Sequence, residues 1–232
     1  MSSNTLTPET TIVLVTGANQ GIGLEVVKKL TAEHPDYHVI LSGRRPDAVQ
    51  EAASSFQAQG LTKSIQDTYG RLDVLINNSA ISGLSLNVSP RSRMQTVFDT
   101  NVIGTGLVTD ALLPLLERSS KTRRVVFVTS ALGSLARKAD PASDLHKPDY
   151  GVYTYSKSAL NMLALHYAIR YEDNSQWKIN IVCPGHHCGT TLNGFQGADD
   201  PSLGAVSICQ AATLGADGKT GTFTDDKGTI PW

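Results

Sequence analysis

Two side chains with usable acid–base chemistry, Tyr153 and Lys157, stand four residues apart in the stretch 151–163, GVYTYSKSALNML. Apolar residues recur there with helical spacing, and residues i and i+4 share one face of a helix. The phenol and the ammonium would therefore point into the same space. A nearby cation favours phenolate, so we expect Lys157 to lower the pKa of Tyr153 and make it an acid or base near neutral pH. A surface helix that merely carries both residues is the simpler alternative.

A glycine-rich turn near the N-terminus is the second candidate for chemistry. The apolar run at 11–16, TIVLVT, predicts a strand buried on both faces, and a helical pattern, LEVVKKLTAEH, follows at 24–34. Gly17 between them allows a tight turn, Gly21 lets the backbone approach a pyrophosphate, and Gly23 permits close helix–strand packing. The N-terminus of the helix attracts phosphate. Strand, glycine turn and helix together favour a nucleotide site over a turn without a ligand.

Composition narrows the class of protein. The chain has 232 residues, of which 40% are hydrophobic and 18% charged, and a net charge of −1 gives no basic field for nucleic acid or an anionic membrane. No apolar run reaches the ~18 residues that span a bilayer, and the polar start MSSNTLTPETT lacks the apolar region of a signal peptide. Three cysteines are too few for a disulfide framework. We therefore expect a cytoplasmic protein with one nucleotide-binding domain over residues 1–232.

Taken together and in order, the motifs resemble those of the short-chain dehydrogenase/reductase family. They are T-G-A-N-Q-G-I-G, N-N-S-A, N-V-I-G, a serine, Y-x-x-x-K and P-G, and the match runs from about residue 11 to residue 232. The ending F-T-D-D-K-G-T-I-P-W is similar to that of carbonyl-reductase-like fungal and plant members. The resemblance implies an α/β fold with a doubly wound, mostly parallel Rossmann-type sheet flanked by helices, which the alternating strand and helix patterns also favour.

The resemblance also implies a reaction and the roles of four residues. The protein would transfer a hydride between a nicotinamide cofactor and a small carbonyl or alcohol substrate, with Tyr153 as the general acid or base. Lys157 would lower the pKa of Tyr153 and hold the nicotinamide ribose, and Ser130 would position the substrate oxygen. The backbone carbonyl of Asn101 would hold a water of a proton relay. A solvent-facing asparagine is the alternative for Asn101.

Other expected elements place these residues. Ser130 ends the expected strand at 124–129, and Ser134 is the second candidate for its role. Thr129 should face away from the site because side chains alternate along a strand. Asn101 falls inside a long expected helix at 92–117. The remaining expected elements are strands at 72–76, 177–182 and 220–224 and helices at 151–171 and 201–214.

Cofactor contacts are expected from several of these segments. In this fold the end of the second strand, expected at 37–42, faces the adenosine ribose. Arg44 and Arg45 follow it and no acidic residue does, so a 2′-phosphate would find forked cationic donors. We therefore expect NADP(H) rather than NAD(H), with two arginines in a solvated loop as the alternative. The expected cofactor-binding residues are Gly17, Asn19, Gln20, Gly21, Ile22, Gly23, Arg44, Asn78, Ser79, Ala80, Tyr153, Lys157, Pro184, Gly185 and Thr190.

One stretch departs strongly from the family pattern. Residues 46–59 would form a helix that Gly60 interrupts, and between Arg45 and Tyr69 we find neither a β-branched run nor the aspartate that contacts adenine in the family. The third strand is therefore expected to be missing, which leaves the second strand at the edge of the sheet. Such a loss would weaken cofactor binding by roughly 1–3 kcal/mol. Ala80, which replaces a family glycine, is a smaller departure.

Two further stretches differ in length. The polar segment at 137–151 makes the interval from Ser130 to Tyr153 about ten residues longer than the commonest family pattern, and it predicts a loop at the substrate mouth. The segment after Pro184 is one residue longer than in the usual family pattern. Thr190 and Thr191 are therefore both candidates for the contact to the nicotinamide side of the cofactor. No metal site is expected, because the spacing is too compressed for a zinc centre in Cys183, His186, His187 and Cys188.

Two other functions fit the same residues. The chain could be a catalytically impaired NADP(H)-binding relative that acts as a binding or interaction protein, which the missing third strand favours. It could also be a nonredox isomerase or cyclase, because a fold does not fix a function. The identity of the substrate, the direction of the reaction and the oligomeric state stay open at this point.

Overall fold

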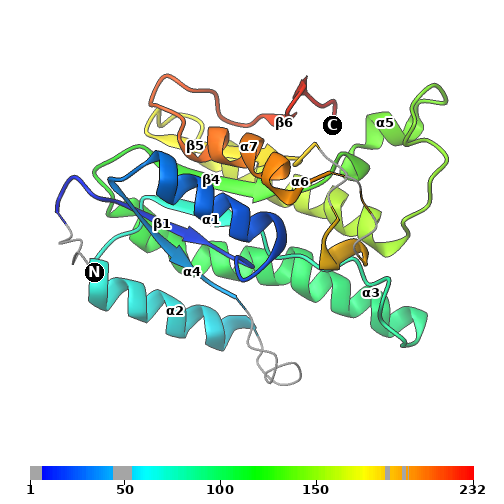
Figure 1. The fold of residues 1–232 in the computed structure, drawn as a ribbon, viewed down its shortest axis with the longest axis horizontal. Helices are drawn as coiled ribbons and strands as arrows, with labels where there is room; N and C mark the ends of the chain where they lie inside the picture. The colour runs from blue at the N-terminus through cyan, green and yellow to red at the C-terminus, as the bar shows by residue number, and fades with distance from the viewer. Residues whose placement is uncertain (1–6, 44–53, 186–188, 195–196, 198) are drawn as a thin grey trace.

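The fold is built around a seven-stranded sheet, against which the helices pack (Figure 1). This computed structural model describes residues 7–43, 54–185, 189–194, 197 and 199–232. The strands are β1 Thr11–Val15, β2 Tyr37–Leu41, β3 Val74–Asn77, β4 Arg123–Val128, β5 Trp177–Val182, β6 Phe223–Asp225 and β7 Gly228–Thr229. Their order is β2-β1-β3-β4-β5-β6-β7, and the described neighbours run parallel except for β6 and β7. The mostly parallel Rossmann-type sheet is thereby confirmed.

Helices cover both faces of this sheet. They are α1 Gly21–Glu33, α2 Ser54–Tyr69, α3 Pro90–Phe98, α4 Thr105–Glu117, α5 Leu135–Ala139, α6 Val152–Arg170 and α7 Pro201–Ala212, with the π-helix η1 Asp99–Gly104 and the 3-10 helices η2 Ala131–Gly133 and η3 Thr191–Asn193. On one face Ile65 of α2, Leu112 of α4 and Leu160 of α6 share a buried apolar cluster. On the other, Val26 of α1 packs in a second cluster with Ile208 of α7.

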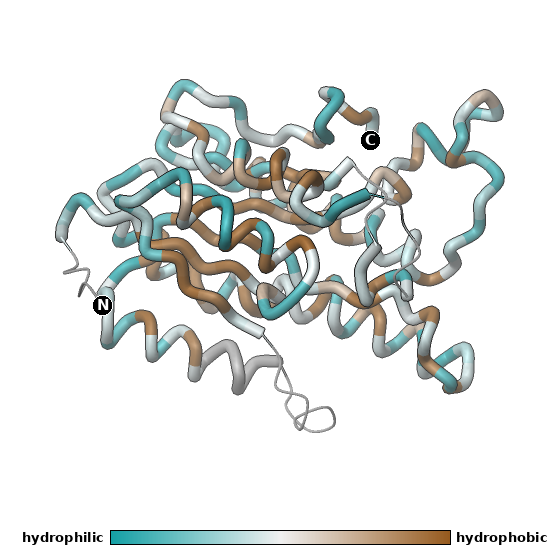
Figure 2. Tube along the Cα trace, in the orientation of Figure 1, coloured by the Kyte–Doolittle hydropathy of each residue, from teal (hydrophilic) through white to brown (hydrophobic). Residues whose placement is uncertain are grey.

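Strand β1 shows why the sheet is buried on both sides. All five of its residues are buried. Ile12 and Leu14 belong to the first apolar cluster, whereas Val13 and Val15 belong to the second, because successive side chains point to opposite faces. Figure 2 shows the strands as the brown, hydrophobic centre of the trace. The continuous apolar run in the sequence is therefore explained by a central parallel strand.

Strand β2 forms one edge of the sheet. Among the described residues it pairs with β1 alone, in the register Thr11 to Tyr37 through Val15 to Leu41. The chain then returns through α2 to β3, which lies on the other side of β1. The expectation that no third strand covers β2 is confirmed for the residues that the structure describes. Leu41, at the end of this strand, is 45% exposed.

Helix α2 differs from the expectation at its glycine. Residues 46–53 of the expected helix lie outside the described residues, and α2 runs without interruption through Gly60. The prediction that Gly60 interrupts the helix is therefore wrong. Gly60 is exposed, and its helical cost of about 1 kcal/mol is outweighed because Leu61 and Ile65 pack against the apolar core.

Three other boundaries also differ. The helix expected at 92–117 is divided by the π-helix η1, where Asn101 makes buried contacts. The loop expected at 137–151 begins inside the short helix α5, which the Ser134 hydroxyl caps by accepting from the Arg137 amide. The strand expected at 220–224 corresponds to β6, which begins only at Phe223. Gly221 before it has a φ of +69°, which is outside the range of extended backbone.

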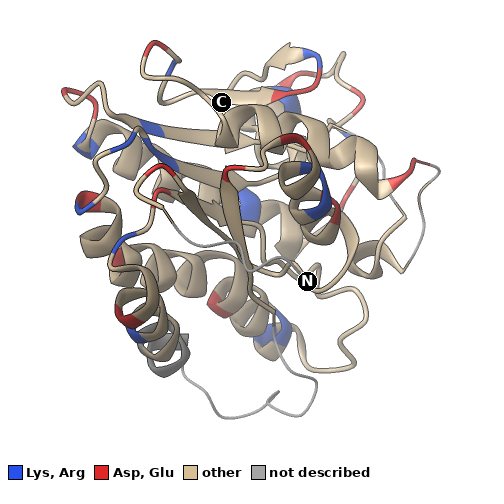
Figure 3. Ribbon diagram, turned by 60° about the vertical axis from the view of Figure 1, so that its left-hand side comes forward, with Lys and Arg blue, Asp and Glu red and all other residues tan. Residues whose placement is uncertain are grey.

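Charges are spread over the outside of the fold. In the view of Figure 3, basic and acidic residues alternate over helices and loops. No helix of the described residues is long and apolar enough to cross a bilayer.

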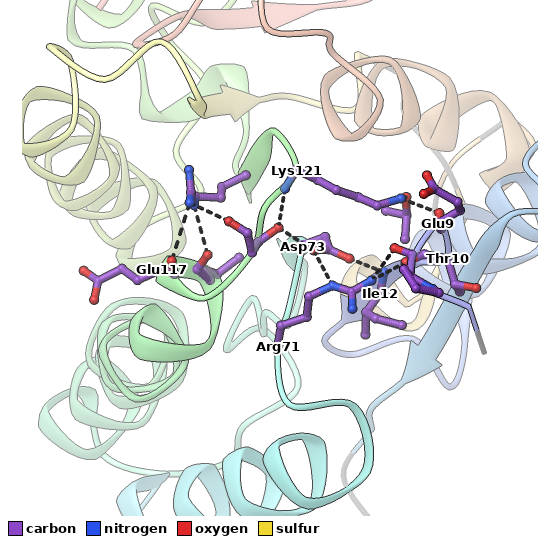
Figure 4. A network of polar contacts seen from close by, with 12 residues as sticks. Glu9, Thr10, Ile12, Arg71, Asp73, Glu117 and Lys121 are labelled. Atoms are coloured by element: carbon purple, nitrogen blue, oxygen red, sulfur yellow. Dashed lines mark hydrogen bonds and ion pairs between the residues drawn. The ribbon is translucent and has the colours of Figure 1, made fainter.

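A buried carboxylate ties the amino ends of the strands together (Figure 4). Asp73 is 0% exposed, and its Oδ2 accepts from the backbone N–H of Ile12 at 2.7 Å. Its Oδ1 accepts from Nε of Arg71 at 3.2 Å and from the Ser119 hydroxyl. Arg71 also donates to the Thr10 carbonyl at 2.7 Å. This network joins β1, β3 and the turn before β4 at the end opposite the glycine turn.

Replacing Asp73 with alanine is expected to lower the free energy of unfolding by about 2–4 kcal/mol, because a buried N–H and a cation lose their partner. Urea unfolding of both proteins measures the difference. The control is Asp67→Ala, an exposed aspartate of α2, which should change the free energy by less than about 0.5 kcal/mol. Equal effects of the two substitutions would contradict the anchoring role.

Candidate active site

A groove of about 250 Å³ lies at the carboxyl ends of the central strands. Such an edge is where ligands bind in open α/β sheets. The groove brings together most of the expected cofactor residues, which are Gly17, Asn19, Gln20, Gly21, Ile22, Gly23, Asn78, Ser79, Ala80, Tyr153, Lys157, Pro184 and Thr190. Gly185 does not line it, and Arg44 lies outside the described residues. Its remaining walls come from Val128, Thr129, Thr191 and Leu192.

The glycine turn has the geometry of a phosphate cradle. Gly17 and Gly21 take φ values of +63° and +56°, which side chains other than glycine rarely adopt. A Cβ on Gly23 would lie 2.6 Å from the carbonyl oxygen of Gly17 and 2.4 Å from Nδ2 of Asn78. Helix α1 begins at Gly21 without a side-chain cap, so its first amides remain available to an anion at the groove.

The turn after β3 is clamped to the glycine turn. Nδ2 of Asn78 donates to the carbonyls of Thr16 at 3.0 Å and Gly17 at 3.2 Å. The Thr16 hydroxyl in turn accepts from the amides of Asn78 and Ser79 at 3.0 and 3.1 Å. Asn78 therefore shapes the wall of the groove. Asn77 points elsewhere, since its amide donates to the Thr109 hydroxyl at 3.0 Å.

Helix α6 brings the tyrosine and the lysine together at the groove. Nζ of Lys157 lies 5.6 Å from the ring centroid of Tyr153, so the expected shared face is confirmed. Lys157 is 2% exposed and donates to the carbonyl of Val128 at 3.0 Å. Gly151, with a φ of +51°, directs the chain into the helix. Its amide donates to Oδ1 of Asp149 at 2.7 Å.

Ser130 lies on the turn after β4, beside this helix. Its hydroxyl accepts from the amide of Leu132 at 3.2 Å and thereby begins η2, but Ser130 is not among the residues that line the groove. A Cβ on Gly133, in the same turn, would lie 2.8 Å from the backbone of Lys157. The turn therefore packs directly against the helix that carries the tyrosine.

The hydroxyls of Ser134, the second candidate for the role of Ser130, and of Thr129 are both bonded to other groups. Ser134 is 1% exposed, and its hydroxyl donates to the carbonyl of Pro231 at 2.5 Å. The hydroxyl of Thr129 donates to Oδ1 of Asn161 at 2.6 Å, but Thr129 is among the residues that line the groove, so the expectation that it faces away is not confirmed. The role of Ser130 stays a prediction, because Ser130 does not line the groove.

Asn101 is enclosed rather than solvated. It is 0% exposed, so the solvent-facing alternative is wrong. Its Oδ1 accepts from the Ile81 amide at 2.9 Å, and its Nδ2 donates to the Ile81 carbonyl at 2.9 Å and to the Ser156 hydroxyl at 3.0 Å. Its own carbonyl accepts from the Thr105 hydroxyl at 3.0 Å. A π-turn in mid-helix is frequently found at a functional site.

Both competing threonines line the groove. Thr190 approaches Gly21, where an added Cβ would lie 3.5 Å from its methyl group. Asn193 and Thr190 form a reciprocal capping box around η3. The Thr191 hydroxyl accepts from Nε2 of Gln20 at 2.8 Å, which joins the segment after β5 to the glycine turn across the groove.

A family model described as short chain dehydrogenase matches residues 11–200 of this sequence. The chain belongs to the short-chain dehydrogenase family. Short-chain dehydrogenases are oxidoreductases that transfer a hydride with a nicotinamide cofactor.

Curated relatives and solved structures agree with that family. Short-chain dehydrogenase anuI of Penicillium roqueforti is 34% identical and aligns over 94% of this chain and 95% of its own. Carbonyl reductase (NADPH) 1 of Sus scrofa is 27% identical, over 100% of this chain and 96% of its own. Salutaridine reductase from Papaver somniferum shares the fold, with a TM-score of 0.75 at 23% identity, over 93% of this chain and 99% of its own.

In this short-chain dehydrogenase, burial shifts the pKa values of Tyr153 and Lys157. It raises the pKa of Tyr153 far above the usual 10, with a smaller contribution from Cys183, so the expectation of a lowered pKa is wrong. Loss of hydration disfavours the charged phenolate, and no opposing effect of Lys157 contributes to the shift. Burial also lowers the pKa of Lys157 to about 8. The phenol therefore stays protonated at neutral pH.

Two buried residues beside Tyr153 and Lys157, Cys183 and Ser156, are not among the site residues expected from the motifs. Cys183 is 8% exposed, and its Sγ accepts from the amides of Ala131 at 3.2 Å and Gly185 at 3.4 Å. Ser156 lies inside the Y-x-x-x-K motif and is 0% exposed. A serine within the apolar pattern of the helix was the one sequence signal that could have indicated a role for Ser156. Nothing in the sequence near Cys183 indicates that its sulfur accepts hydrogen bonds. Among the described residues no group of three metal-ligating side chains occurs, and His186, His187 and Cys188 lie outside them.

Replacing Lys157 with methionine is expected to raise the free energy of unfolding by about 1–3 kcal/mol at pH 7. Folding lowers the pKa of this lysine from 10.5 to about 8, so the cost of burying its charge is full below pH 8 and vanishes above 10.5. The advantage of the variant should therefore shrink as the pH rises between these values. Urea unfolding across that range measures it.

The control for this comparison is Lys63→Met, at an exposed position of α2. It should leave the free energy of unfolding within about 0.5 kcal/mol of wild type at each pH. A Lys157→Met protein that is less stable than wild type at pH 7 would show that burial of the ammonium carries no net cost.

Proposed function

We propose that this protein is an NADP(H)-dependent carbonyl reductase in which Tyr153 is the general acid. The observation that carries the proposal is the position of Tyr153 and Lys157 on a groove whose other end is a glycine turn at the start of α1. Membership of the short-chain dehydrogenase family supports the reaction type. Two relatives named as NADPH carbonyl reductases support the direction of carbonyl reduction, in which the tyrosine gives up a proton.

The residues of the groove fit a dinucleotide. Gly17, Gly21 and the first amides of α1 would hold the pyrophosphate, because the backbone there is accessible and positively polarised. Gln20 and Thr191, which are bonded across the groove, would separate or shift to admit it. Thr190 would contact the nicotinamide side. When bound, the nicotinamide supplies the hydride.

The side chains of this chain would handle the proton. Tyr153 donates its phenolic hydrogen to the substrate carbonyl oxygen as that oxygen becomes an alcohol, which leaves a phenolate. Lys157, protonated below pH about 8, stabilises that phenolate and holds the ribose hydroxyls. Ser130 donates a hydrogen bond that orients the substrate oxygen. The second lone pair of the Asn101 carbonyl holds the water through which the proton is restored.

The preference for NADP(H) rests on sequence and relatives. Arg44 and Arg45 follow β2, at the end that faces the ribose in this fold, and no acidic residue accompanies them. Two relatives at 27% identity carry NADPH in their names, the carbonyl reductases of Sus scrofa and Rattus norvegicus. A small carbonyl compound is the proposed substrate.

A second candidate is an NADP(H)-binding protein without turnover. The edge position of β2 favours it, because a family-type third strand would otherwise add to the adenine pocket. The buried Lys157 beside Tyr153 favours the reductase, since a buried lysine is costly to keep without a function.

The cofactor preference predicts micromolar binding of NADPH and binding of NADH weaker by about tenfold or more. Titration followed by nicotinamide fluorescence measures both constants. Arg44→Glu should weaken NADPH binding and leave NADH binding nearly unchanged, because it removes a partner of the 2′-phosphate. A folded protein that binds neither nucleotide would exclude both candidates.

The acid role of Tyr153 predicts that Tyr153→Phe lowers kcat for carbonyl reduction by about 10²- to 10⁴-fold, with the Kd of NADPH changed less than about threefold. The matched control is Tyr155→Phe, two residues further along the same helix, where the side chain is 52% exposed. It should keep kcat within about twofold of wild type. If Tyr153→Phe reduces carbonyls as fast as wild type, another group is the acid.

A further inference from the structure

We infer that Ser156 is a positioning residue for Tyr153 and acts through a buried hydrogen bond to Asn101. The inference rests on the proposed reaction and adds a residue to it. Ser156 lies on α6 between Tyr153 and Lys157 and is 0% exposed, as is Asn101. Buried polar side chains require partners, so the bonds of this serine identify what it holds.

The direction of both Ser156 bonds follows from chemistry. The side-chain amide nitrogen of Asn101 can only donate, so the serine oxygen accepts there, at 3.0 Å. The single hydroxyl hydrogen is then free to donate to the backbone carbonyl of Tyr153, at 2.8 Å. One side chain thus joins the backbone of the proposed acid to the π-helix η1.

The other end of this bridge is the loop after β3. The Asn101 amide bonds both the N–H and the C=O of Ile81 at 2.9 Å, and Ile81 follows Ala80, which lines the groove. The two hydrogens of its nitrogen and its oxygen are all in use. The bridge therefore runs from Ile81 through Asn101 and Ser156 to Tyr153, and all its side-chain members are buried.

The first turn of α6 needs such an anchor. The helix begins at Val152, and Gly151 before it provides no side-chain cap. The first turn of a helix has amides without intrahelical partners and opens more readily than the centre. Tyr153 is the second residue of this turn. A displacement of about 1 Å in a reacting group can cost about 100-fold in rate, so an anchored turn has direct value for the proton transfer.

The test compares Ser156→Ala with Ser158→Ala. The Ser158 hydroxyl also bonds a carbonyl one turn back, that of Thr154 at 3.3 Å, but it contacts Gly133 at 3.1 Å rather than Asn101. Ser156→Ala is expected to lower kcat about 10- to 100-fold, with the carbonyl KM and the Kd of NADPH changed less than about threefold. Ser158→Ala should keep kcat within about twofold.

A second readout needs no turnover. Amide hydrogen exchange at Ile81 and in the first turn of α6 is expected to become about 3- to 10-fold faster in Ser156→Ala and to stay at the wild-type rate in Ser158→Ala. The double variant Asn101→Ala with Ser156→Ala should be no slower in turnover than Asn101→Ala alone, because both substitutions break one bridge.

Three results would overturn the inference: an unchanged kcat in Ser156→Ala, an equal loss in Ser158→Ala, or unchanged exchange at Ile81 in Ser156→Ala. A wild-type protein that binds NADPH but reduces no carbonyl would instead fail the proposed function. The exchange comparison alone would then decide whether Ser156 holds the turn that carries Tyr153.

Discussion

The close approach of two backbone turns is the constraint on which the groove depends. The turn after β1 and the turn after β3 meet so closely that Gly23 has no room for a methyl group, and Asn78 fastens them through the carbonyls of Thr16 and Gly17. Helix α1 can then begin at Gly21, with no side-chain cap on its first amides, at the groove. Every other wall of the groove is arranged around this contact.

The proposed proton transfer and the stability of the fold make opposite demands on α6. Lys157 is almost fully enclosed, and its pKa falls to about 8 because an ammonium loses hydration there. The same enclosure raises the pKa of Tyr153 and keeps its proton in place. The cost of burying Lys157 is reduced by a hydrogen bond to the backbone, because the Val128 carbonyl accepts from its ammonium group. A site of this kind is stable because the sheet beneath it is large and apolar.

The local sequence pattern was sufficient to predict the strands and helices of the central sheet. It was also sufficient to predict that residues within one motif lie close together. The buried strand β1, the glycine turn and the i, i+4 pair of Tyr153 and Lys157 follow from spacing alone. The pKa of Tyr153 could not be predicted in the same way, because it depends on how much protein covers the phenol. The bonds of Asn101 to Ile81 and Ser156 also join segments 20 and 55 residues apart, which no local period records. Arg44 stays a prediction from sequence.

The hydrogen bonds of Asp73 and the groove lie at opposite ends of the same sheet. Asp73 binds β1, β3 and the turn before β4 at their amino ends, while the groove occupies the carboxyl ends of the same strands. Selection on thermal tolerance and selection on substrate range can therefore act on different ends of one sheet. A lineage of such proteins can adapt to a hotter habitat by changes around the carboxylate and keep its chemistry, or change its chemistry in the loops and keep its heat resistance.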